Sequence, residues 1–574
     1  MNIDKAVEFL ETLEDELPAN SQHETIDIIE LPPETVDEMS DAEEFDDEEI
    51  GETQIVDVPG NVEVYVGTDD ESEDQASIRK SKRKKIDQKE IPKWKISVPK
   101  PTVPTIDNYT NKPVIEELIR EFIDKNPFEL FMLNMSGIFE IIQHQSQIYA
   151  AQKNDPSFHC TTEDYMVFVG ILLFSGHRPY PRQELYWSLH PNFDCPIIRE
   201  AMPKNRFMAL KKYFHLNNNL EIPENCKDRC FKIRPLIEKM NENFLQFGYF
   251  SDKYSVDEKI VGYYGRHPIK QFIRGKPVRF GFKEWALCST SGYTYKFFVY
   301  QGANEQPRPK NVLLGTEVVL NLLEKIPSGV SVFFDNFFTN MDLMKSLTEL
   351  SIKASGTVRL NRLPGNPFGA KKDLMKKEKG FLKTAVDAIS GLFACTWKDN
   401  SIVTVLSNID GVNPMKQANR RGQQVQVPKC ITEYNAGMLG VDLADWKTQK
   451  YRVGIKSKKW YFSLVTHCLD VTVVNSHILY SLLHPEENMD LLDFRVFVTT
   501  ALLKTDSNSK PKKPGVKVPR LPKPLNLIGE KHFLERTDDG KQRKCKVCKK
   551  NVRKQCRQCN LGFHLQCFEE YHSN

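Results

Sequence analysis

The spacing of apolar residues divides the chain into helical and strand-like stretches. From residue 114 to about residue 247, apolar residues recur every three or four positions, and Met166 to Phe174 is apolar on all sides, as in a buried helix. At Tyr254 the pattern changes to short apolar runs separated by glycine-containing turns, which predicts strands over residues 254–264, 280–288 and 293–300. A helical domain is therefore expected to precede a β-containing one.

Strands and helices then alternate. The expected elements are a helix, a buried strand, a helix, a two-stranded hairpin and two further helices, over residues 316–325, 331–334, 339–350, 392–397 with 402–406, 434–447 and 461–483. The hairpin lies among lysine- and glycine-rich turns that look like an insertion. Three strands followed by strand–helix alternation indicate a multidomain α/β fold with a β-containing insertion.

Charge is distributed very unevenly along the 574 residues. The formal net charge is only +2, yet residues 1–77 hold 27 Asp and Glu against a single Lys, a balance of about −26. This acidic tail is poor in aromatic residues, so it buries too little apolar area to offset its ordering entropy and is expected to be disordered. The basic remainder favours a polyanionic partner, with nucleic acid as the first candidate.

Two short patterns lie in and after the tail. Ala6, Leu10, Leu13 and Leu17 form a helical stripe, which suits either a frayed solvated helix or docking to a protein partner. Residues 79–85, Arg-Lys-Ser-Lys-Arg-Lys-Lys, reverse the charge and can act as a nuclear-import signal, a phosphate-binding arm or a solvated linker. Their accessible position favours import, and hence a nuclear protein.

Membrane and secreted classes are disfavoured. The longest apolar run, Met166 to Phe174, falls short of the roughly 18–20 residues that cross a bilayer, so no membrane partner is expected. The first ten residues include two acids and lack the pattern of a secretory signal. The chain has 13 Cys, clustered toward its C-terminus, which fits reduced thiols and a metal site better than a disulfide framework.

Three carboxylates stand at positions suited to a hard cation. Asp257 interrupts a predicted strand, Asp335 ends one, and Asp442 lies at a predicted helix. Acids at neighbouring strand ends can approach closely enough to bind Mg²⁺, and a pair of such ions supports phosphodiester chemistry. Taken alone, each Asp is equally compatible with a turn or a helix cap.

Ordered segments around these acids resemble those of the piggyBac transposase family. The matching segments are Asn205-Arg206-Phe207, Ser255-Val256-Asp257-Glu258, Gly265-Arg266, Lys276-Pro277, Phe334-Asp335-Asn336-Phe337-Phe338-Thr339 and Gly440-Val441-Asp442-Leu443-Ala444-Asp445. The resemblance runs from about residue 114 to residue 574, and it is greatest to the piggyBac transposable element-derived proteins of animals.

The resemblance implies an RNase H-like catalytic core that coordinates two Mg²⁺ ions. Asp257 would lie on its first strand, Asp335 just after its fourth and Asp442 on a later helix, with Asp445 as a supporting acid. In the family, water nicks one strand at each transposon end, the freed 3′-OH forms a hairpin, and the reopened end joins a TTAA target. Double-stranded DNA and a homodimer are the implied partners.

Two one-sided basic stretches are candidate DNA contacts, since a run of cations without acids suits phosphates. One follows Asp257 and the other follows Asp442, and the residues assigned to DNA binding are Arg266, Arg274, Lys276, Arg279, Lys456, Lys458, Lys459 and Trp460. Aromatic residues interleave with the second stretch, and Trp460, which aligns with a family Trp, is expected to stack on an unpaired base. Trp446 is interpreted as an ordinary core residue.

The C-terminus carries a dense set of metal ligands. Cys545, Cys548, Cys556, Cys559, His564, Cys567 and His572 have spacings that suit Zn²⁺, and His532 supplies the eighth ligand needed for two structural sites. The family cross-brace implies one site from Cys545, Cys548, His564 and Cys567 and another from His532, Cys556, Cys559 and His572. Interleaved Lys and Arg favour contact with DNA; such a module could instead hold a histone tail or a protein partner, and its basic surface disfavours the basic histone tail.

These patterns define nine segments. They are an acidic tail (1–77), a basic and Pro-rich linker (78–113), a helical dimerisation and DNA-binding domain (114–250), the first stretch of the catalytic core (251–359), an insertion (360–430), the second stretch of the core (431–447), a second helical DNA-binding region (448–503), a linker (504–529) and a zinc-binding domain (530–574). The leading hypothesis is a nuclear, Mg²⁺-dependent DNA transposase or a domesticated derivative. The alternative is a host DNA-binding or chromatin protein without transposition activity.

Overall fold

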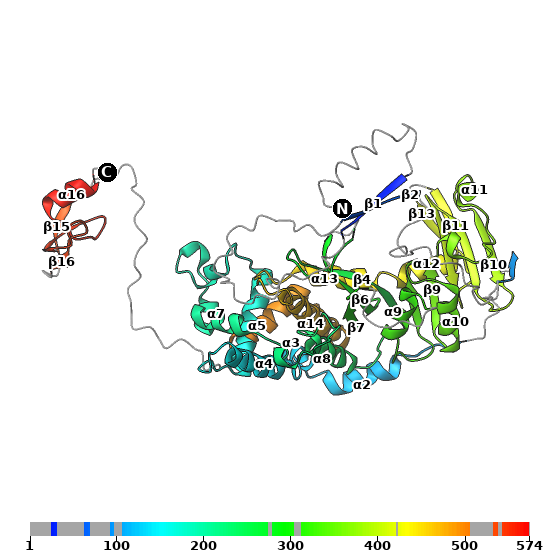
Figure 1. Cartoon of the computed structure of the whole chain (residues 1–574), viewed down its shortest axis with the longest axis horizontal. Helices are drawn as coiled ribbons and strands as arrows, with labels where there is room; N and C mark the ends of the chain where they lie inside the picture. The colour runs from blue at the N-terminus through cyan, green and yellow to red at the C-terminus, as the bar shows by residue number, and fades with distance from the viewer. Residues whose placement is uncertain are drawn as a thin grey trace. The chain divides into compact units, whose positions relative to one another are not determined.

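The chain forms two compact units, Met1–Pro511 and Lys512–Asn574 (Figure 1). The computed structural model describes residues 24–30, 62–68, 92–96, 106–273, 278–302, 312–420, 423–505, 532–537 and 542–572. Within these residues the larger unit has an α-helical region and a mixed β-sheet with its covering helices, and the smaller unit has short strands and one helix.

Helices are the commonest regular elements of the described chain. The α-helices are α2 (Lys112–Phe122), α3 (Pro127–Asn134), α4 (Ile138–Gln152), α5 (Thr162–His177), α6 (Pro196–Ala201), α7 (Lys204–Tyr213), α8 (Arg234–Leu245), α9 (Leu314–Leu322), α10 (Met341–Glu349), α11 (Lys371–Met375), α12 (Lys429–Gly437), α13 (Gly440–Lys450), α14 (Phe462–Leu483), α15 (Leu491–Leu503) and α16 (Leu565–His572). Short 3-10 helices are η3 (Gln183–Trp187), η4 (Pro191–Phe193), η5 (Asn219–Glu221) and η6 (Leu360–Arg362).

The strands fall into one large sheet and four small ones. They are β1 (Glu24–Glu30), β2 (Val62–Thr68), β3 (Trp94–Ile96), β4 (Lys253–Gly262), β5 (Lys270–Phe272), β6 (Phe280–Ser289), β7 (Thr294–Val299), β8 (Ser331–Phe334), β9 (Lys353–Thr357), β10 (Leu382–Asp387), β11 (Phe393–Lys398), β12 (Ile402–Ser407), β13 (Lys416–Arg420), β14 (Gln423–Val427), β15 (Leu534–Arg536), β16 (Arg543–Lys544), β17 (Asn551–Val552) and β18 (Lys554–Cys556).

The large sheet has ten strands in the order β3-β10-β11-β12-β9-β8-β4-β6-β5, with β7 also paired to β6. Strands β4, β6 and β7 are the three strands that the sequence predicts, and they form an antiparallel meander, whereas β8 runs parallel to β4 and β9 parallel to β8. Strands β10 to β12 come from the predicted insertion and extend the same sheet through the antiparallel β12–β9 pair. The predicted hairpin at 392–406 is thereby confirmed as β11 and β12.

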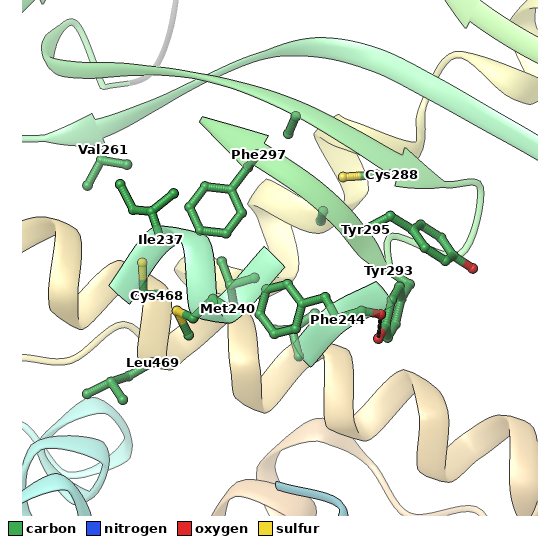
Figure 2. Close-up of a cluster of buried hydrophobic side chains, with 14 of the residues drawn as sticks. Ile237, Met240, Phe244, Val261, Cys288, Tyr293, Tyr295, Phe297, Cys468 and Leu469 are labelled. Atoms are coloured by element: carbon green, nitrogen blue, oxygen red, sulfur yellow. Dashed lines mark hydrogen bonds between the residues drawn. The ribbon is translucent and has the colours of Figure 1, made fainter. Parts of the chain in front are cut away.

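Buried aromatic and aliphatic side chains join the sheet to the helical region (Figure 2). Phe244 of α8 packs beside Tyr293 and Phe297, and the Tyr293 hydroxyl donates to the Phe244 carbonyl oxygen at 2.8 Å. Cys468 and Leu469 of α14 contribute to the same core. This shared core makes the helices and the sheet one folded body, because neither side could bury these residues alone.

Helix α14 is the one helix in the described residues that is long and apolar enough to cross a membrane. By length and composition it passes that test, but 89% of its most apolar 18-residue window is buried inside the molecule. Neighbouring helices and strand β4 pack around it. Such burial is typical of the central helix of a folded core.

Two strand pairs depart from the expectations for the N-terminal region. β1 and β2 pair antiparallel within the tail that was expected to be disordered; both are rich in β-branched residues, which favour strands. Trp94 to Ile96, in the expected linker, pairs with β10 as strand β3. The helical stripe beginning at Ala6, the basic run 79–85 and most of the linker 504–529 lie outside the described residues.

Candidate active site

Asp257 lies on strand β4, and Asp335 directly follows the neighbouring parallel strand β8. Val256 of β4 pairs with Phe334 of β8, and each Asp is the next residue along its own chain. Because strand side chains alternate between faces, Asp257 shares its face with Ser255, and Asp335 continues the alternation from Phe333, the partner of Ser255. The two acids therefore share one face of the sheet.

Helix α13 brings Asp442 to the same face. The Val441 N–H donates to Ser255 Oγ at 2.9 Å, which fixes the start of the helix on strand β4. A Cβ atom on Gly440 would lie 2.4 Å from the Ser289 carbonyl oxygen and 2.6 Å from Ser255 Oγ, so only glycine allows this approach. Asp442 follows in the first turn of α13, with its side chain exposed.

A buried tyrosine lies within electrostatic range of all three acids. The pKa of Tyr434, on α12, is raised well above its usual value by burial and then by the carboxylates of Asp335, Asp257 and Asp442. Its hydroxyl group donates to Met438 Sδ at 2.7 Å and lies 3.4 Å from Thr357 Oγ1. The protonated phenol of Tyr434 thus lies near enough to all three carboxylates to sense their charge.

Backbone donors orient the two acids that lie on the sheet. The Glu258 N–H donates to Asp257 Oδ1 at 2.8 Å, and the Phe337 N–H donates to Asp335 Oδ1 at 2.8 Å. Burial raises the pKa of the Asp335 carboxyl group against the lowering effect of the Phe337 N–H, and Glu258 raises it further. A carboxylate that is buried beside another acid is stabilised by a bound cation.

Asp445, the expected supporting acid, lies three residues beyond Asp442 on α13. It is half-buried, and its Oδ2 accepts a hydrogen bond from Gln449 Nε2 at 2.8 Å. In the described residues, two Cys/His groups have ligand atoms that all lie within 4.8 Å of one another. The carboxylate oxygens of the acids do not all lie within this distance of one another. The acids form an open cluster on one face.

Tyr434 is absent from the site residues predicted from sequence. The expected single helix over residues 434–447 is two helices in the structure, and Gly437 ends the first of them. A Cβ atom on Gly437 would lie 2.1 Å from the Phe333 ring, so α12 packs directly on strand β8. That close contact holds the helix that carries Tyr434 against the sheet, and no periodicity in the sequence signals it.

The predicted basic contacts divide into exposed and buried groups. Arg266, Arg279, Lys456 and Lys458 have exposed side chains, whereas Arg274 and Lys276 lie outside the described residues. Lys459 is buried, and its ammonium group donates to the carbonyl oxygens of Lys212 at 2.7 Å and Phe214 at 3.0 Å. Because these bonds occupy it within the helical region, the assignment of Lys459 to DNA is wrong for this structure.

The burial of the two tryptophans is the reverse of that expected. Trp460 is only 3% exposed, and its ring stacks on His267 with centroids 4.0 Å apart and meets the Phe282 ring edge to face. Those contacts leave no free face for a base, so the stacking role predicted for Trp460 is wrong here. Trp446, interpreted from sequence as a core residue, is 60% exposed.

Eight Cys and His side chains form two groups of four in the C-terminal unit. One group is Cys545, Cys548, His564 and Cys567, and the other is His532, Cys556, Cys559 and His572. These are the two sets that the family resemblance implied.

The distances within the groups suit a tetrahedral ion. His532 Nδ1 lies 3.3 Å from Cys559 Sγ and 3.5 Å from Cys556 Sγ, and Cys548 Sγ lies 3.3 Å from His564 Nδ1. A zinc ion with Zn–S of about 2.3 Å and Zn–N of about 2.0–2.1 Å separates sulfur from nitrogen by roughly 3.5 Å. The residues present therefore fit Zn²⁺.

Comparisons with known proteins agree with this architecture. A family model described as Transposase IS4 matches residues 125–477. PiggyBac transposable element-derived protein 3 of Homo sapiens is 33% identical over 486 residues, covering 82% of this chain and 78% of that protein. PiggyBac transposable element-derived protein 2 of Homo sapiens is 29% identical over 551 residues, covering 92% of this chain and 91% of that protein.

A solved structure has the same fold. It is the cryo-EM structure of a piggyBac transposase synaptic complex with hairpin DNA, which matches with a TM-score of 0.57 and 20% identity over 77% of this chain and 97% of that one. Fold and site define a transposase-like α/β protein with a carboxylate cluster. Together with the family match and the 33% identity, they show that the chain belongs to the piggyBac transposase family.

The different burial of Trp446 and Trp460 predicts different effects on stability. Trp460→Ala removes a fully packed ring and is expected to lower the free energy of unfolding by about 3–5 kcal/mol. Trp446→Ala removes an exposed ring and is expected to change it by less than about 0.5 kcal/mol. Denaturant unfolding followed by circular dichroism measures both. Equal losses for the two variants would contradict the assigned burial.

Proposed function

We propose that this chain is a metal-dependent DNA transposase, or a domesticated derivative that keeps the same chemistry. The observation that carries the proposal is the convergence of Asp257, Asp335 and Asp442 on one face of the sheet, around Tyr434. The order of the core strands supports an RNase H-like core, since β4 is the first strand and β8 the fourth when β4, β6, β7, β8 and β9 are counted.

The three acids would hold two Mg²⁺ ions. Bound at such a cluster, the ions supply activation of a water or 3′-hydroxyl nucleophile and stabilisation of the leaving oxygen. The protein orients the ligands: the N–H groups of Glu258 and Phe337 each hold one oxygen of an acid, and Ser255 holds the helix that carries Asp442. Tyr434, with its raised pKa, stays protonated beside the acids and adds no negative charge.

Double-stranded DNA is the proposed substrate. Arg266 and Arg279 lie on either side of strand β5, at the sheet edge that follows Asp257, and Lys456 and Lys458 follow α13, so exposed cations follow both Asp257 and Asp442 in the sequence. The solved relative is, by its title, a synaptic complex with hairpin DNA. By analogy, hairpin ends, TTAA targets, a homodimer and a nuclear location belong to this proposal.

The test is strand cleavage in vitro. Full-length protein with Mg²⁺ is expected to nick linear DNA that carries the terminal repeats of its own element, and Asp335→Asn is expected to lower the rate at least a thousandfold while DNA affinity stays within about twofold. Asp342→Asn, an acid in the first turn of α10, is the matched control and should cleave normally.

The outcome separates the two candidate functions. If the wild type and Asp335→Asn bind the repeats equally and neither nicks them in Mg²⁺ or Mn²⁺, the enzymatic proposal is refuted. The chain would then be a host DNA-binding protein that retains the fold.

The C-terminal unit is proposed to bind two structural Zn²⁺ ions, one in each Cys/His group. The ligand distances suit the tetrahedral geometry of zinc, and His572 is oriented by its Nδ1, which lies 2.9 Å from the Phe568 carbonyl oxygen. Since small units of this kind have little apolar core, the ions would supply much of the folding free energy.

Metal analysis tests the zinc proposal. Purified full-length protein is expected to contain about two zinc ions per chain, and Cys559→Ser about one, because each group needs all four ligands. Cys226→Ser, a half-buried Cys of the larger unit, should still contain two. A zinc content that Cys559→Ser leaves unchanged would contradict the ligand assignment.

A further inference from the structure

One side of helix α13 carries a stripe of exposed side chains on both sides of Asp442. Leu439, Asp442, Trp446 and Lys450 are three or four residues apart, so they follow one another along the same side of the helix. Leu439 is 59% exposed and Trp446 is 60% exposed, and the side chains of Asp442 and Lys450 are exposed as well. Large apolar side chains therefore precede and follow Asp442 at one-turn spacing.

The exposure of Trp446 calls for a physical reason. Of the six Trp in the chain, all of them described by the structure, it alone is exposed, and the large rings of Trp285, Trp397 and Trp460 are almost completely buried. An indole left in water gives up the stabilisation that burial would provide. The other side of α13 is packed tightly on β4 and β6, so the helix cannot rotate to cover the ring.

The charges beside the ring favour a polyanionic ligand. The Lys450 ammonium group lies 5.5 Å from the centre of the Trp446 ring and 5.3 Å from the centre of the Tyr451 ring. A cation held there attracts phosphate, while the indole offers a flat apolar surface. An aromatic face with a cation beside it is the combination that binds single-stranded nucleic acid.

We propose that Trp446 stacks on an unpaired nucleobase of the DNA strand bound at Asp442. The inference rests on the DNA-binding part of the proposed function, and it adds a residue that binds a base of a strand no longer paired in a duplex. Asp442 and Trp446 are four residues apart, a rise of about 6 Å along the helix. Two nucleotide steps of about 3.4 Å each span a slightly longer distance. A base next to the nucleotide at Asp442 therefore reaches the Trp446 ring. A base inside an intact duplex has both faces covered and cannot stack there.

Binding measurements without catalysis test this role. Full-length, zinc-loaded protein in Ca²⁺, with neither Mg²⁺ nor EDTA, is titrated with a blunt duplex and with the same duplex extended by a short thymine overhang that contains 2-aminopurine. The wild type is expected to bind the extended duplex more tightly and to quench 2-aminopurine fluorescence. Trp446→Ala is expected to weaken binding of the extended duplex about tenfold and to abolish quenching, with blunt-duplex affinity unchanged.

Two further variants make the result specific. Trp446→Phe keeps an aromatic face and should restore most of the preference for the extended duplex. Phe497→Ala removes an aromatic residue that is 44% exposed on α15 and should behave as the wild type. The proposal is overturned if the wild type has no preference, if Trp446→Ala keeps it, or if Trp446→Ala weakens both duplexes equally.

This test is independent of cleavage. A chain that nicks no DNA but loses the overhang preference in Trp446→Ala supports the stacking role and refutes the enzymatic function. If the protein cleaves DNA in Mg²⁺ but binds both duplexes equally, the enzymatic function is supported and the stacking role is refuted. The two proposals therefore fail separately.

Discussion

The direct contact of helix α13 with strands β4 and β6 is the constraint on which the candidate site depends. Gly440 rests against the Ser289 carbonyl oxygen and Ser255 Oγ, where any side chain would collide, and the Val441 N–H is bonded to that same Ser255 hydroxyl. Further along the helix, a Cβ on Gly292 in the β6–β7 turn would lie 3.2 Å from the Ala444 N. These contacts hold an acid that is 185 residues from Asp257 in the chain on the same face as Asp257.

Much of this architecture could be predicted from the sequence, because its signals are local. The meander of β4, β6 and β7, the buried strand β8 and the long helix α14 each have their own apolar pattern, and the three Asp were assigned from segments that resemble a family. The eight Cys and His were identified from their spacing and were grouped by that resemblance, and the structure places the same residues together. Predictions that rest on a pattern within one segment, or on a segment shared with a family, therefore agree with the structure.

The features that were missed arise from contacts between distant segments. Trp446 and Trp460 lie in one basic, aromatic stretch and cannot be told apart by composition. His267 and Phe282, from the region of β5 and β6, cover Trp460, and no equivalent cover reaches Trp446 among the described residues. Lys459 has the sequence surroundings of a DNA contact, but carbonyl oxygens at the end of α7 bind its ammonium group. Tertiary contacts decide such assignments.

Binding of Mn²⁺ to the zinc-loaded full-length protein, followed by electron paramagnetic resonance, shows whether the packing of α13 builds a metal-binding carboxylate cluster. If it does, the wild type binds two Mn²⁺ per chain, Asp257→Asn binds neither, and Gly440→Ala binds Mn²⁺ at least tenfold more weakly with an unchanged circular dichroism spectrum. Mn²⁺ binding that neither substitution alters would contradict it.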